Sequence, residues 1–467
     1  MTSQRKMPVL SVLLLASFFF STGYTKDRVN TTSPQNDISS IVIHGKAFQV
    51  ENNLRDIAQA LYLTVNYQQW PDVKRFLTAY QKLPGHDAIL INFAQGGLAR
   101  SEGNLTLAAS IYENILRQKP DFTRIKLELA RVYFEDQKNR EAKQLMDELS
   151  KQEQLPKIVL KNIDGYIKAI AQRDRWRSSF SLSYIYDNNI NMSPNMKSTC
   201  LLFIDGKCKV EREIPKGIKT WGSAYHGTLS RRYQLAGHHG IFGRGMIDGE
   251  FYPYYHDENE NTFSLIGGYS FKSRDYDLSI APLFEYKLQS GTPEYHAVGA
   301  RIEGLWAITA RTVLSTDLEH KRFSYRPVYH WKNGDIFSSY FTLSHLISHS
   351  FTLFGGTNWS YRNSKQPANR YQQWGATAGI SGPLSSGIDG SLFMTLEHQR
   401  FGAYNALLGA RREENKQIYT ASAKFPVAQI LGVTPSITFR HTRNRSSVGW
   451  LYSYNKNEVQ IQLEKYF

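Results

Sequence analysis

After Tyr24 the sequence contains no apolar stretch of about 18 residues, the length that a membrane-spanning helix requires. Hydrophobic residues make up 41% of the chain and the mean hydropathy is −0.44, which argues against a bundle of membrane helices. The same averages are compatible with a membrane β-barrel, because its strands alternate lipid-facing apolar residues with polar residues that line the lumen.

Recognisable catalytic motifs are also missing. The sequence has neither Gly-x-Ser-x-Gly nor His-Glu-x-x-His, the patterns of many acyl-transfer and zinc enzymes. Its 13 histidines are scattered, and the tightest pair, His238 and His239, falls in a predicted turn. Asp257, Glu258 and Glu260 could bind a divalent cation, although a solvated loop explains them better. We predict a protein that is not an enzyme, with no metal site and no cofactor.

Cysteine is nearly absent, since only Cys200 and Cys208 occur, in a polar segment. In an oxidising compartment such a pair favours a disulfide that closes a short loop. A two-cysteine metal site would need further ligands nearby, and the neighbouring sequence offers none. We therefore expect a structural disulfide and not a redox centre.

Acidic residues are outnumbered, because 56 Lys and Arg stand against 41 Asp and Glu and give a formal net charge of +15. The basic residues are dispersed, whereas nucleic-acid-binding proteins gather them into a patch or an arm. We expect them to line a barrel lumen and to contact lipopolysaccharide phosphates at its rim. No nucleic-acid partner is predicted.

The N-terminus has the three parts of a secretory signal, a positive start, an apolar run and small residues. These parts are Arg5 and Lys6, Val9 to Phe20, and Ser21 with Gly23. We predict a signal peptide over residues 1–23, without a lipid anchor, because no cysteine follows the apolar run. Residues 24–53 are polar and are predicted to be a linker that leads into the first domain.

From residue 54 to residue 173 the apolar residues follow helical spacing, and the chain aligns with itself at an offset of about 34 residues. The superposed pairs are Gly96 with Ala130, Ala99 with Tyr133, Ala108 with Ala142, Tyr112 with Met146, and Ile115 with Leu149. Small residues let paired helices approach closely, and bulky ones fill the space between repeats. This pattern resembles the tetratricopeptide repeat.

We therefore predict a tetratricopeptide-like helical domain over residues 54–173, with two clear repeats. A degenerate repeat from Leu54 to about Pro84 precedes them, and a helix from about Leu155 to Ile170 caps the stack. An unrelated helical bundle with chance periodicity is the alternative.

Residues 174–467 follow a period of two, which is the period of β-strands. One such run has Phe263, Leu265, Tyr269 and Phe271 alternating with Ser264, Gly268 and Ser270. The runs last about ten to fourteen residues, enough to cross a bilayer at the tilt of barrel strands. About fourteen of them occur, an even number as bacterial barrels require. We predict an antiparallel transmembrane β-barrel and not a soluble sandwich, whose strands last about 5–6 residues.

Odd-numbered connections between the runs are predicted to be long and even-numbered ones short, as in barrels with external loops and periplasmic turns. The long ones span 187–217, 253–260, 289–294, 322–335, 363–371, 401–415 and 444–456. The short ones include Ser273–Arg274, Ala307–Ile308 and Ser348–His349. This order predicts a Gram-negative outer-membrane protein with the helical domain in the periplasm and the cysteine loop outside.

The whole mature chain resembles the surface lipoprotein assembly modifier (Slam) family in joining a short repeat domain to a fourteen-strand barrel. Residues 187–191, Asp-Asn-Asn-Ile-Asn, look like that family's Asp-x-Asn-[IV]-Asn signature. The last residue, Phe467, follows Leu463, Ile461 and Val459 on one strand face, which resembles the C-terminal signal for the barrel insertion machinery. The family resemblance implies transport of lipoproteins, or of secreted haem-scavenging proteins, to the cell surface.

The signature residues Asp187, Asn188, Asn189 and Asn191 allow two explanations. Asx side chains at a strand end commonly build turns, whereas the resemblance implies a gate or a contact with the client. Our leading prediction is a translocation accessory that binds a periplasmic client and delivers it across the outer membrane. An exopolysaccharide export porin and a passive nutrient channel with a scaffold domain remain alternatives.

Overall fold

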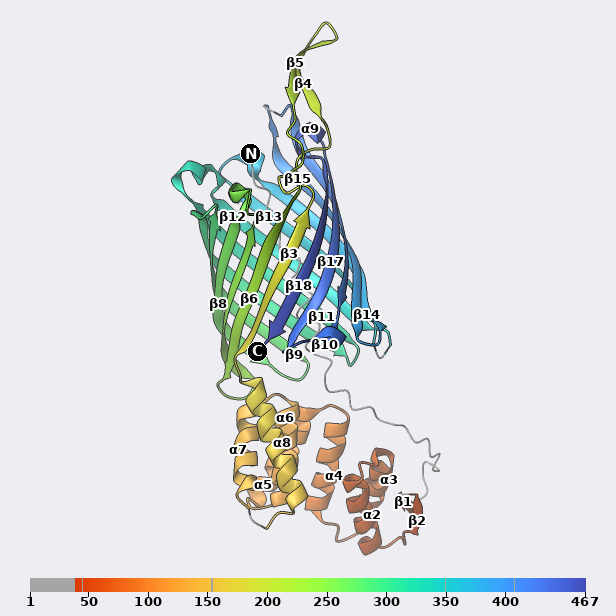
Figure 1. Cartoon of the computed structure of the whole chain (residues 1–467). Coiled ribbons are helices and arrows are strands. Elements are labelled where there is room, and N and C mark those ends of the chain that lie inside the picture. The colour runs from red at the N-terminus through yellow and green to blue at the C-terminus, as the bar shows by residue number, and fades with distance from the viewer. Residues whose placement is uncertain (1–37, 44, 153, 349, 407) are drawn as a thin grey trace. The chain divides into compact units, whose positions relative to one another are not determined.

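The structure, a computed structural model, describes residues 38–467 except 44, 153, 349 and 407. The predicted signal peptide and residues 24–37 of the predicted linker lie outside the described residues. The chain divides into two compact units, Met1–Ile170 and Ala171–Phe467, close to the predicted boundary after residue 173. Figure 1 shows a helical first unit and a barrel as the second.

The described part of the first unit contains a short β-hairpin and seven helices. The helices are α2 (Leu54–Asn66), α3 (Trp70–Gln81), α4 (Ala88–Ser101), α5 (Leu105–Gln118), α6 (Thr123–Glu135), α7 (Asn139–Ser150) and α8 (Lys157–Arg173). Asn53, Asp87 and Asn104 each accept a backbone hydrogen bond in the first turn that follows, which starts α2, α4 and α5. None of the helices among the described residues is long and apolar enough to cross a membrane.

The hairpin corrects part of the predicted linker over residues 24–53. Strand β1 (Ser40–Ile43) pairs with β2 (Lys46–Gln49), and Ile41 and Ile43 are buried in the hydrophobic core of the helices. Arg75 of α3 donates to the Ser40 carbonyl at 2.7 Å. The alternation of Ile41 and Ile43 therefore reflects a strand with one buried face, although the surrounding residues are polar.

The second unit is a closed barrel of fourteen strands. They are β3 (Arg177–Asp187), β6 (Thr220–Gln234), β7 (His239–Phe251), β8 (Glu260–Lys272), β9 (Tyr276–Gln289), β10 (Thr292–Thr309), β11 (Thr312–Tyr325), β12 (Gly334–Leu346), β13 (Thr352–Ser364), β14 (Tyr371–Ser385), β15 (Ile388–Asn405), β16 (Ala410–Lys424), β17 (Val433–Ser446) and β18 (Tyr454–Tyr466). Each strand pairs with its neighbours in antiparallel register, and β18 pairs with β3 to close the barrel. The predicted number of strands is confirmed.

The side chains alternate between the two faces of this wall. In β3, Phe180, Leu182 and Tyr184 are exposed on the outer face, whereas Ser181 and Ser183 between them are buried on the lumen face. In β9, Leu278, Ile280 and Phe284 are exposed in the same way. The apolar outer face and the polar inner face are those of a membrane barrel.

We call the end of the barrel where β3 finishes the loop rim, and the end where β3 begins the turn rim. A two-stranded sheet, β4 (Ser198–Ile204) with β5 (Lys207–Glu213), extends from the loop rim within the first connection (Figure 1). The C-terminus lies at the turn rim (Figure 1). Both ends of the chain within the barrel, the start of β3 and the end of β18, are therefore at the same rim.

Two of the predicted long loops are wrong. Strand β9 ends at Gln289 and β10 begins at Thr292, so a two-residue turn replaces the predicted loop 289–294. Ser290 and Gly291 have φ of 54° and 73°, the conformation of a tight hairpin turn. The predicted loop 401–415 is mostly strand, because β15 continues to residue 405 and β16 begins at residue 410. In this segment Arg412 pairs with Glu414 at 2.6 Å, and Glu413 pairs with Arg400 at 2.9 Å.

Two further details of the connections differ from the prediction. Ala307 and Ile308 do not form a turn, because β10 continues to Thr309 and its alternation extends with it. At the turn rim the connection 425–432 is long, so the long and short connections alternate less strictly than predicted. The turn predicted at Ser348–His349 includes His349, which lies outside the described residues.

Candidate functional site

The predicted packing positions of the repeats lie in the core of the helical unit. Gly96 of α4 faces Tyr112 of α5, and a Cβ atom on Gly96 would lie 2.5 Å from a ring carbon of Tyr112. The small residues at the other positions, all buried, are Ala99, Ala108, Ala130 and Ala142. Tyr133 is half-buried, and its hydroxyl donates to Glu113 at 2.7 Å. Small residues thus allow the close helix contacts that a repeat stack needs.

Polar contacts join the first helices of successive repeats. Arg124 of α6 donates to the Asn66 side chain of α2 at 2.8 Å, and its guanidinium lies 5.7 Å from the ring centroid of Phe93 on α4. Glu128 forms ion pairs with Arg124 at 3.0 Å and with Arg131 at 3.3 Å. We call the surface made by Tyr62, Asn66, Arg124 and Arg131, which lies over the buried Phe93 and Glu128, the first-helix face. It combines an aromatic ring with ordered cations.

A second link between repeats is the ion pair of Arg100 on α4 with Glu135 on α6. Burial by itself lowers the pKa of the guanidinium, but two hydrogen bonds to Glu135, at 3.0 and 3.1 Å from Nε, outweigh burial and raise the pKa. The ion pair therefore joins α4 to α6.

The strand-end signature lies at the loop rim, where β3 and β18 meet. Asp187 is the last residue of β3 and is fully buried. Its carboxylate lies 2.5 Å from Nζ of Lys456 on β18 and accepts a hydrogen bond from the Asn189 backbone at 2.9 Å. A buried ion pair therefore crosses the closure of the barrel.

Where β3 and β18 stop pairing with each other, side chains of the signature asparagines form hydrogen bonds to the backbone instead. Asn189 donates to the carbonyls of Ser193 and Asn455, both at 3.0 Å, and accepts from the Ser193 backbone at 2.8 Å. Asn188 accepts from the backbone of Asn457 at 2.8 Å.

Asn191 extends the same network away from β18. Its side chain accepts from the Ile218 backbone at 2.9 Å and donates to the Lys216 carbonyl at 3.2 Å, just before β6. The signature thus holds together the end of β3, the start of β18 and the segment that leads into β6. Side chains that bond to backbone in this way build turns.

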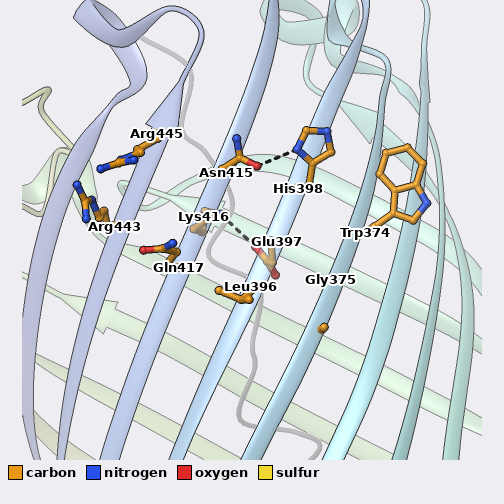
Figure 2. Close-up of a pocket in the computed structure, with 11 residues that line it drawn as sticks. Trp374, Gly375, Leu396, Glu397, His398, Asn415, Lys416, Gln417, Arg443 and Arg445 are labelled. Carbon is orange, nitrogen blue, oxygen red and sulfur yellow. Dashed lines mark hydrogen bonds and ion pairs between the residues drawn. The ribbon is translucent and has the colours of Figure 1, made fainter.

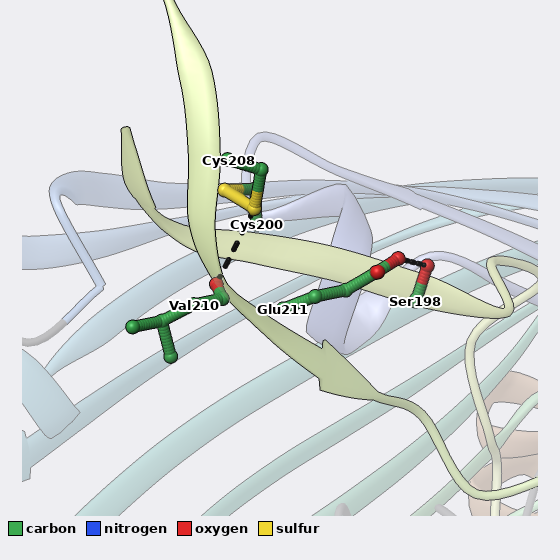
Figure 3. The surroundings of a disulfide bond; sticks show 5 residues. All are labelled: Ser198, Cys200, Cys208, Val210 and Glu211. Carbon is green, nitrogen blue, oxygen red and sulfur yellow. Dashed lines mark hydrogen bonds between the residues drawn. A yellow bond between two sulfur atoms is a disulfide. The ribbon is translucent and has the colours of Figure 1, made fainter. Parts of the chain in front are cut away.

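The two cysteines join β4 to β5. The disulfide between Cys200 and Cys208 has a Cα–Cα distance of 5.7 Å, and Sγ of Cys208 lies 3.5 Å from the Val210 carbonyl oxygen (Figure 3). Ser198 and Glu211 make a hydrogen bond nearer the base of the hairpin (Figure 3). The disulfide closes an exposed hairpin of the first connection.

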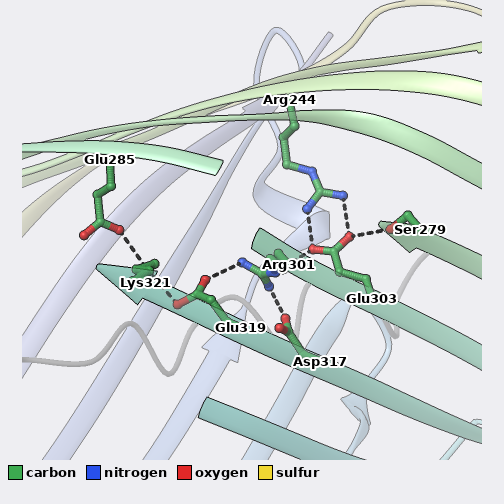
Figure 4. A network of polar contacts seen from close by, with 8 residues as sticks. All are labelled: Arg244, Ser279, Glu285, Arg301, Glu303, Asp317, Glu319 and Lys321. Atoms are coloured by element: carbon green, nitrogen blue, oxygen red, sulfur yellow. Dashed lines mark hydrogen bonds and ion pairs between the residues drawn. The ribbon is translucent and has the colours of Figure 1, made fainter. Parts of the chain in front are cut away.

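A network of charges lines the lumen on β7 and β9–β11. Arg301 of β10 forms ion pairs with Glu303 at 2.9 Å and with Asp317 and Glu319 of β11 (Figure 4). Arg244 of β7 makes two hydrogen bonds to Glu303, at 2.7 and 3.0 Å. Within this network carboxylates and cations alternate, so each charged side chain lies beside one of opposite charge.

The network continues from β11 to β9. Lys321 lies 2.8 Å from Glu285 and 2.9 Å from Glu319 (Figure 4). The intervening strand carries Gly299 opposite Lys321, and the missing side chain leaves the path to Glu285 open. This network is therefore polar, and its cations and carboxylates largely balance one another.

Sequence reasoning did not identify Lys456 or the lumen network. The signal was present, because charged residues recur at every second position in Arg301–Glu303 and in Asp317–Glu319–Lys321, on the face opposite exposed apolar residues such as Ile302. Lys456 has no local signal, since its partner is more than two hundred residues away along the chain. An ion pair between the first and last strands, such as Asp187 with Lys456, forms only when the barrel closes.

The other side chains considered from the sequence have structural partners. Glu260 forms an ion pair with Lys287 at 2.7 Å, and the Asp257 carbonyl accepts from Gln289. Asp257 and Glu258 lie in the short helix η2 (His256–Glu258). The His239 ring lies 2.5 Å from the Tyr269 hydroxyl, and the His238 carbonyl accepts from Arg232. Across residues 38–467, apart from the four undescribed positions, no group of three or more His, Cys, Asp or Glu is arranged to hold a metal.

Comparison with known proteins links both units to one family. Residues 176–467 match the family described as "Surface lipoprotein assembly modifier". Residues 43–146 match "Surface lipoprotein assembly modifier, N-terminal TPR repeats". The first match begins at the start of the barrel, and the second covers most of the helical unit and ends within α7.

Whole-chain relatives agree. The chain is 33% identical to a "Hemophilin secretion modulator" of Acinetobacter baumannii, over 92% of this chain and 89% of that protein. It is 24% identical to "Surface lipoprotein assembly modifier 1" of Haemophilus influenzae, over 85% of this chain and 81% of that protein. It is also 24% identical to the Neisseria meningitidis protein of that name, over 91% of this chain and 86% of that protein. With a tetratricopeptide-like stack, a fourteen-strand barrel and matches to both parts, the chain belongs to the surface lipoprotein assembly modifier family.

Proposed function

We propose that this protein takes up a client protein in the periplasm and delivers it across the outer membrane to the cell surface or the medium. The observation that carries the proposal is the joining, in one chain, of a helical-repeat unit and a closed fourteen-strand barrel, both matching the same family. Repeat stacks bind protein segments, and a wide barrel spans the outer membrane.

The location follows from family and fold. The barrel lies in the outer membrane, and the helical unit, which precedes β3, lies in the periplasm. The turn rim, where β3 begins, is therefore the periplasmic rim. The loop rim, with the signature network and the disulfide hairpin, faces outward.

The capture step is assigned to the first-helix face of the helical unit. The exposed ring of Tyr62, 6.2 Å from the buried Phe93, supplies an apolar surface. Arg124 and Arg131 supply cations that Glu128 holds in place. Such a surface suits an extended protein segment with apolar and acidic side chains, because aromatic and arginine side chains dominate binding energy at protein interfaces.

The delivery step is assigned to the barrel. An eight-strand barrel is filled by its own side chains, whereas wider barrels enclose a polar lumen. The paired charges around Arg301 give this part of the lumen a polar wall in which opposite charges lie together. We propose that the signature network of Asp187 and Asn189 acts as the gate support, holding the first connection in place over the closure of β18 and β3.

Within the family the client can be a lipoprotein or a soluble protein. The likeness to the hemophilin secretion modulator, at 33% identity against 24% for the assembly modifiers, favours a secreted haem-scavenging client. Barrel insertion machinery is a further proposed partner, because β18 carries exposed Ile461 and Leu463 on one face and Phe467 follows the strand directly. We propose a transport role without a catalytic step.

A deletion strain tests the proposal. Intact cells labelled with a membrane-impermeant reagent report surface lipoproteins, and the medium reports secreted haem-binding protein. We expect one of these to fall in the deletion strain and to return when the full-length gene is restored. Unchanged surface and secreted proteins, or loss of an exported polysaccharide alone, would contradict the proposal.

A further inference from the structure

The outer face of β15–β17 changes character near the loop rim. Along β17 the outward residues are first apolar, Ile437 and Phe439, and then basic, Arg443 and Arg445. Residues two apart in a strand share a face, so the two arginines lie on the same outer surface as the two exposed apolar side chains. We call Arg443 and Arg445 the arginine pair.

The arginine pair borders a hollow of about 590 Å³ in this outer surface. Arg443 lies opposite Gln417 of β16, and Arg445 lies opposite Asn415. The His398 ring lies 2.9 Å from the Asn415 side chain, and Trp374 stacks beside His398 at a centroid distance of 6.1 Å. Figure 2 shows these polar side chains around the hollow. Hydrogen-bonding groups and two guanidinium groups thus surround one space.

The guanidinium groups of the pair lack counter-charges. In the part of the chain that the structure describes, no carboxylate lies within ion-pair distance of Arg443 or Arg445, and neighbouring carboxylates are engaged elsewhere. Glu413 pairs with Arg400 at 2.9 Å, and Glu397 pairs with Lys416 at 3.5 Å. Two adjacent cations without a partner favour an anion from outside the chain.

The position of the pair indicates which anion is available. On the same face below the arginine pair, Phe439, Tyr419 and Ile461 are exposed and apolar. An unpaired arginine is unfavourable within hydrocarbon and tolerated at the interface, and tryptophan, here Trp374, is typical of that interface. Because the loop rim faces outward, the arginine pair lies at the level of the outer-leaflet headgroups.

We propose that the arginine pair binds a phosphate group of an outer-leaflet lipid, whose acyl chains lie on the apolar face below. Guanidinium groups bind phosphate through two parallel hydrogen bonds. Asn415, Gln417 and His398 offer further donors for phosphate or sugar oxygens. In a Gram-negative outer leaflet the lipid of this chemistry is lipid A. The site is separate from the lumen and does not depend on the identity of the client.

Binding of lipid A to the purified full-length protein in detergent tests this site. We expect the R443Q/R445Q variant to bind bisphosphorylated lipid A at least about tenfold more weakly than the unaltered protein, since two charge-assisted hydrogen-bonding groups are lost. The matched control is R322Q on β11, an exposed arginine that pairs with Asp335 at 2.9 Å. The control should leave the affinity unchanged.

Further arms separate phosphate recognition from other effects. Lipid A without phosphates should bind the unaltered protein as weakly as bisphosphorylated lipid A binds the variant, and millimolar inorganic phosphate should not displace the lipid. R443K/R445K keeps both positive charges and should bind bisphosphorylated lipid A with intermediate affinity. Retained binding by this variant would show that the site still folds. Equal affinity of R443Q/R445Q and the unaltered protein, equal losses in R322Q, or displacement by inorganic phosphate would overturn the proposal.

Discussion

The absence of a side chain at Gly96 sets how closely α4 and α5 approach. A methyl group there would meet the buried ring of Tyr112 at 2.5 Å. We predict that Gly96→Ala destabilises the helical unit by about 1–3 kcal/mol, the usual effect of overpacking, although alanine favours helix by about 1 kcal/mol over glycine. Thermal unfolding of the full-length protein, followed by helical circular dichroism, measures the change.

Gly165 of α8 is the matched control, because nothing lies within 4 Å of a Cβ atom there. Gly165→Ala should stabilise the unit by up to about 1 kcal/mol through helix propensity alone. If both substitutions shift the unfolding temperature in the same direction, close packing at residue 96 does not limit the stack.

The ion pair between Asp187 and Lys456 makes a second prediction at this scale. The two side chains are 0% and 4% exposed, so Lys456→Met leaves a buried carboxylate without its partner. We expect a loss of about 3–5 kcal/mol in barrel stability, the cost typical of breaking a buried pair. Urea unfolding in lipid vesicles measures it.

Two further variants serve as controls for the Lys456→Met measurement. The double variant Asp187→Asn with Lys456→Met removes both charges and should recover much of the loss. Lys424→Met breaks a pair with Glu464 whose lysine is 37% exposed, so its effect should stay below about 1 kcal/mol. A Lys456→Met effect no larger than that of Lys424→Met would show that the closure of the barrel does not rely on this pair.

At the scale of elements, the β4–β5 hairpin stands outside the barrel wall and is closed by its own disulfide. We predict that Cys200→Ser with Cys208→Ser makes residues 198–213 sensitive to proteases added to intact cells, because the loop loses its constraint. The barrel's unfolding midpoint in urea should not change, since the hairpin pairs with no barrel strand. A lowered midpoint would show that the hairpin supports the wall.

The strands were predictable from sequence because each has to satisfy a strict pattern. Lipid on one side and water on the other require alternation, and runs such as Phe263 to Phe271 display it within a few residues of the observed β8. The connections were less predictable. The residues at 289–294 look like a loop, but Ser290 and Gly291 with positive φ form a tight turn that alternation alone cannot distinguish from a longer one.

The candidate site was partly predictable for the same reason. The signature at Asp187 to Asn191 is continuous in sequence and was therefore found, whereas its partners Lys456 and Asn455 are brought to it by barrel closure. The arginine pair was also missed. Its interpretation depends on the strand register, which places both arginines on the outer face, and on the pairing of the neighbouring Glu413 and Glu397 with other cations.

At the scale of the whole molecule, a periplasmic repeat unit and an outer-membrane barrel are joined in one chain. The repeat unit presents arginine and aromatic side chains on its first-helix face, and the barrel has a polar wall with paired charges. The proposed function assigns capture of the client to the repeat unit and its passage to the barrel. The proposed function therefore requires both units together.

Reconstitution tests this account most directly. The full-length protein would be produced, together with the haem-binding or lipoprotein client identified from the deletion strain, in a Gram-negative host that has no member of the family. The account predicts that the client becomes accessible to protease on intact cells, or appears in the medium, only when this chain is present. It also predicts that the barrel without residues 38–170 gives no export. Client that stays in the periplasm beside the correctly inserted full-length protein would contradict the account.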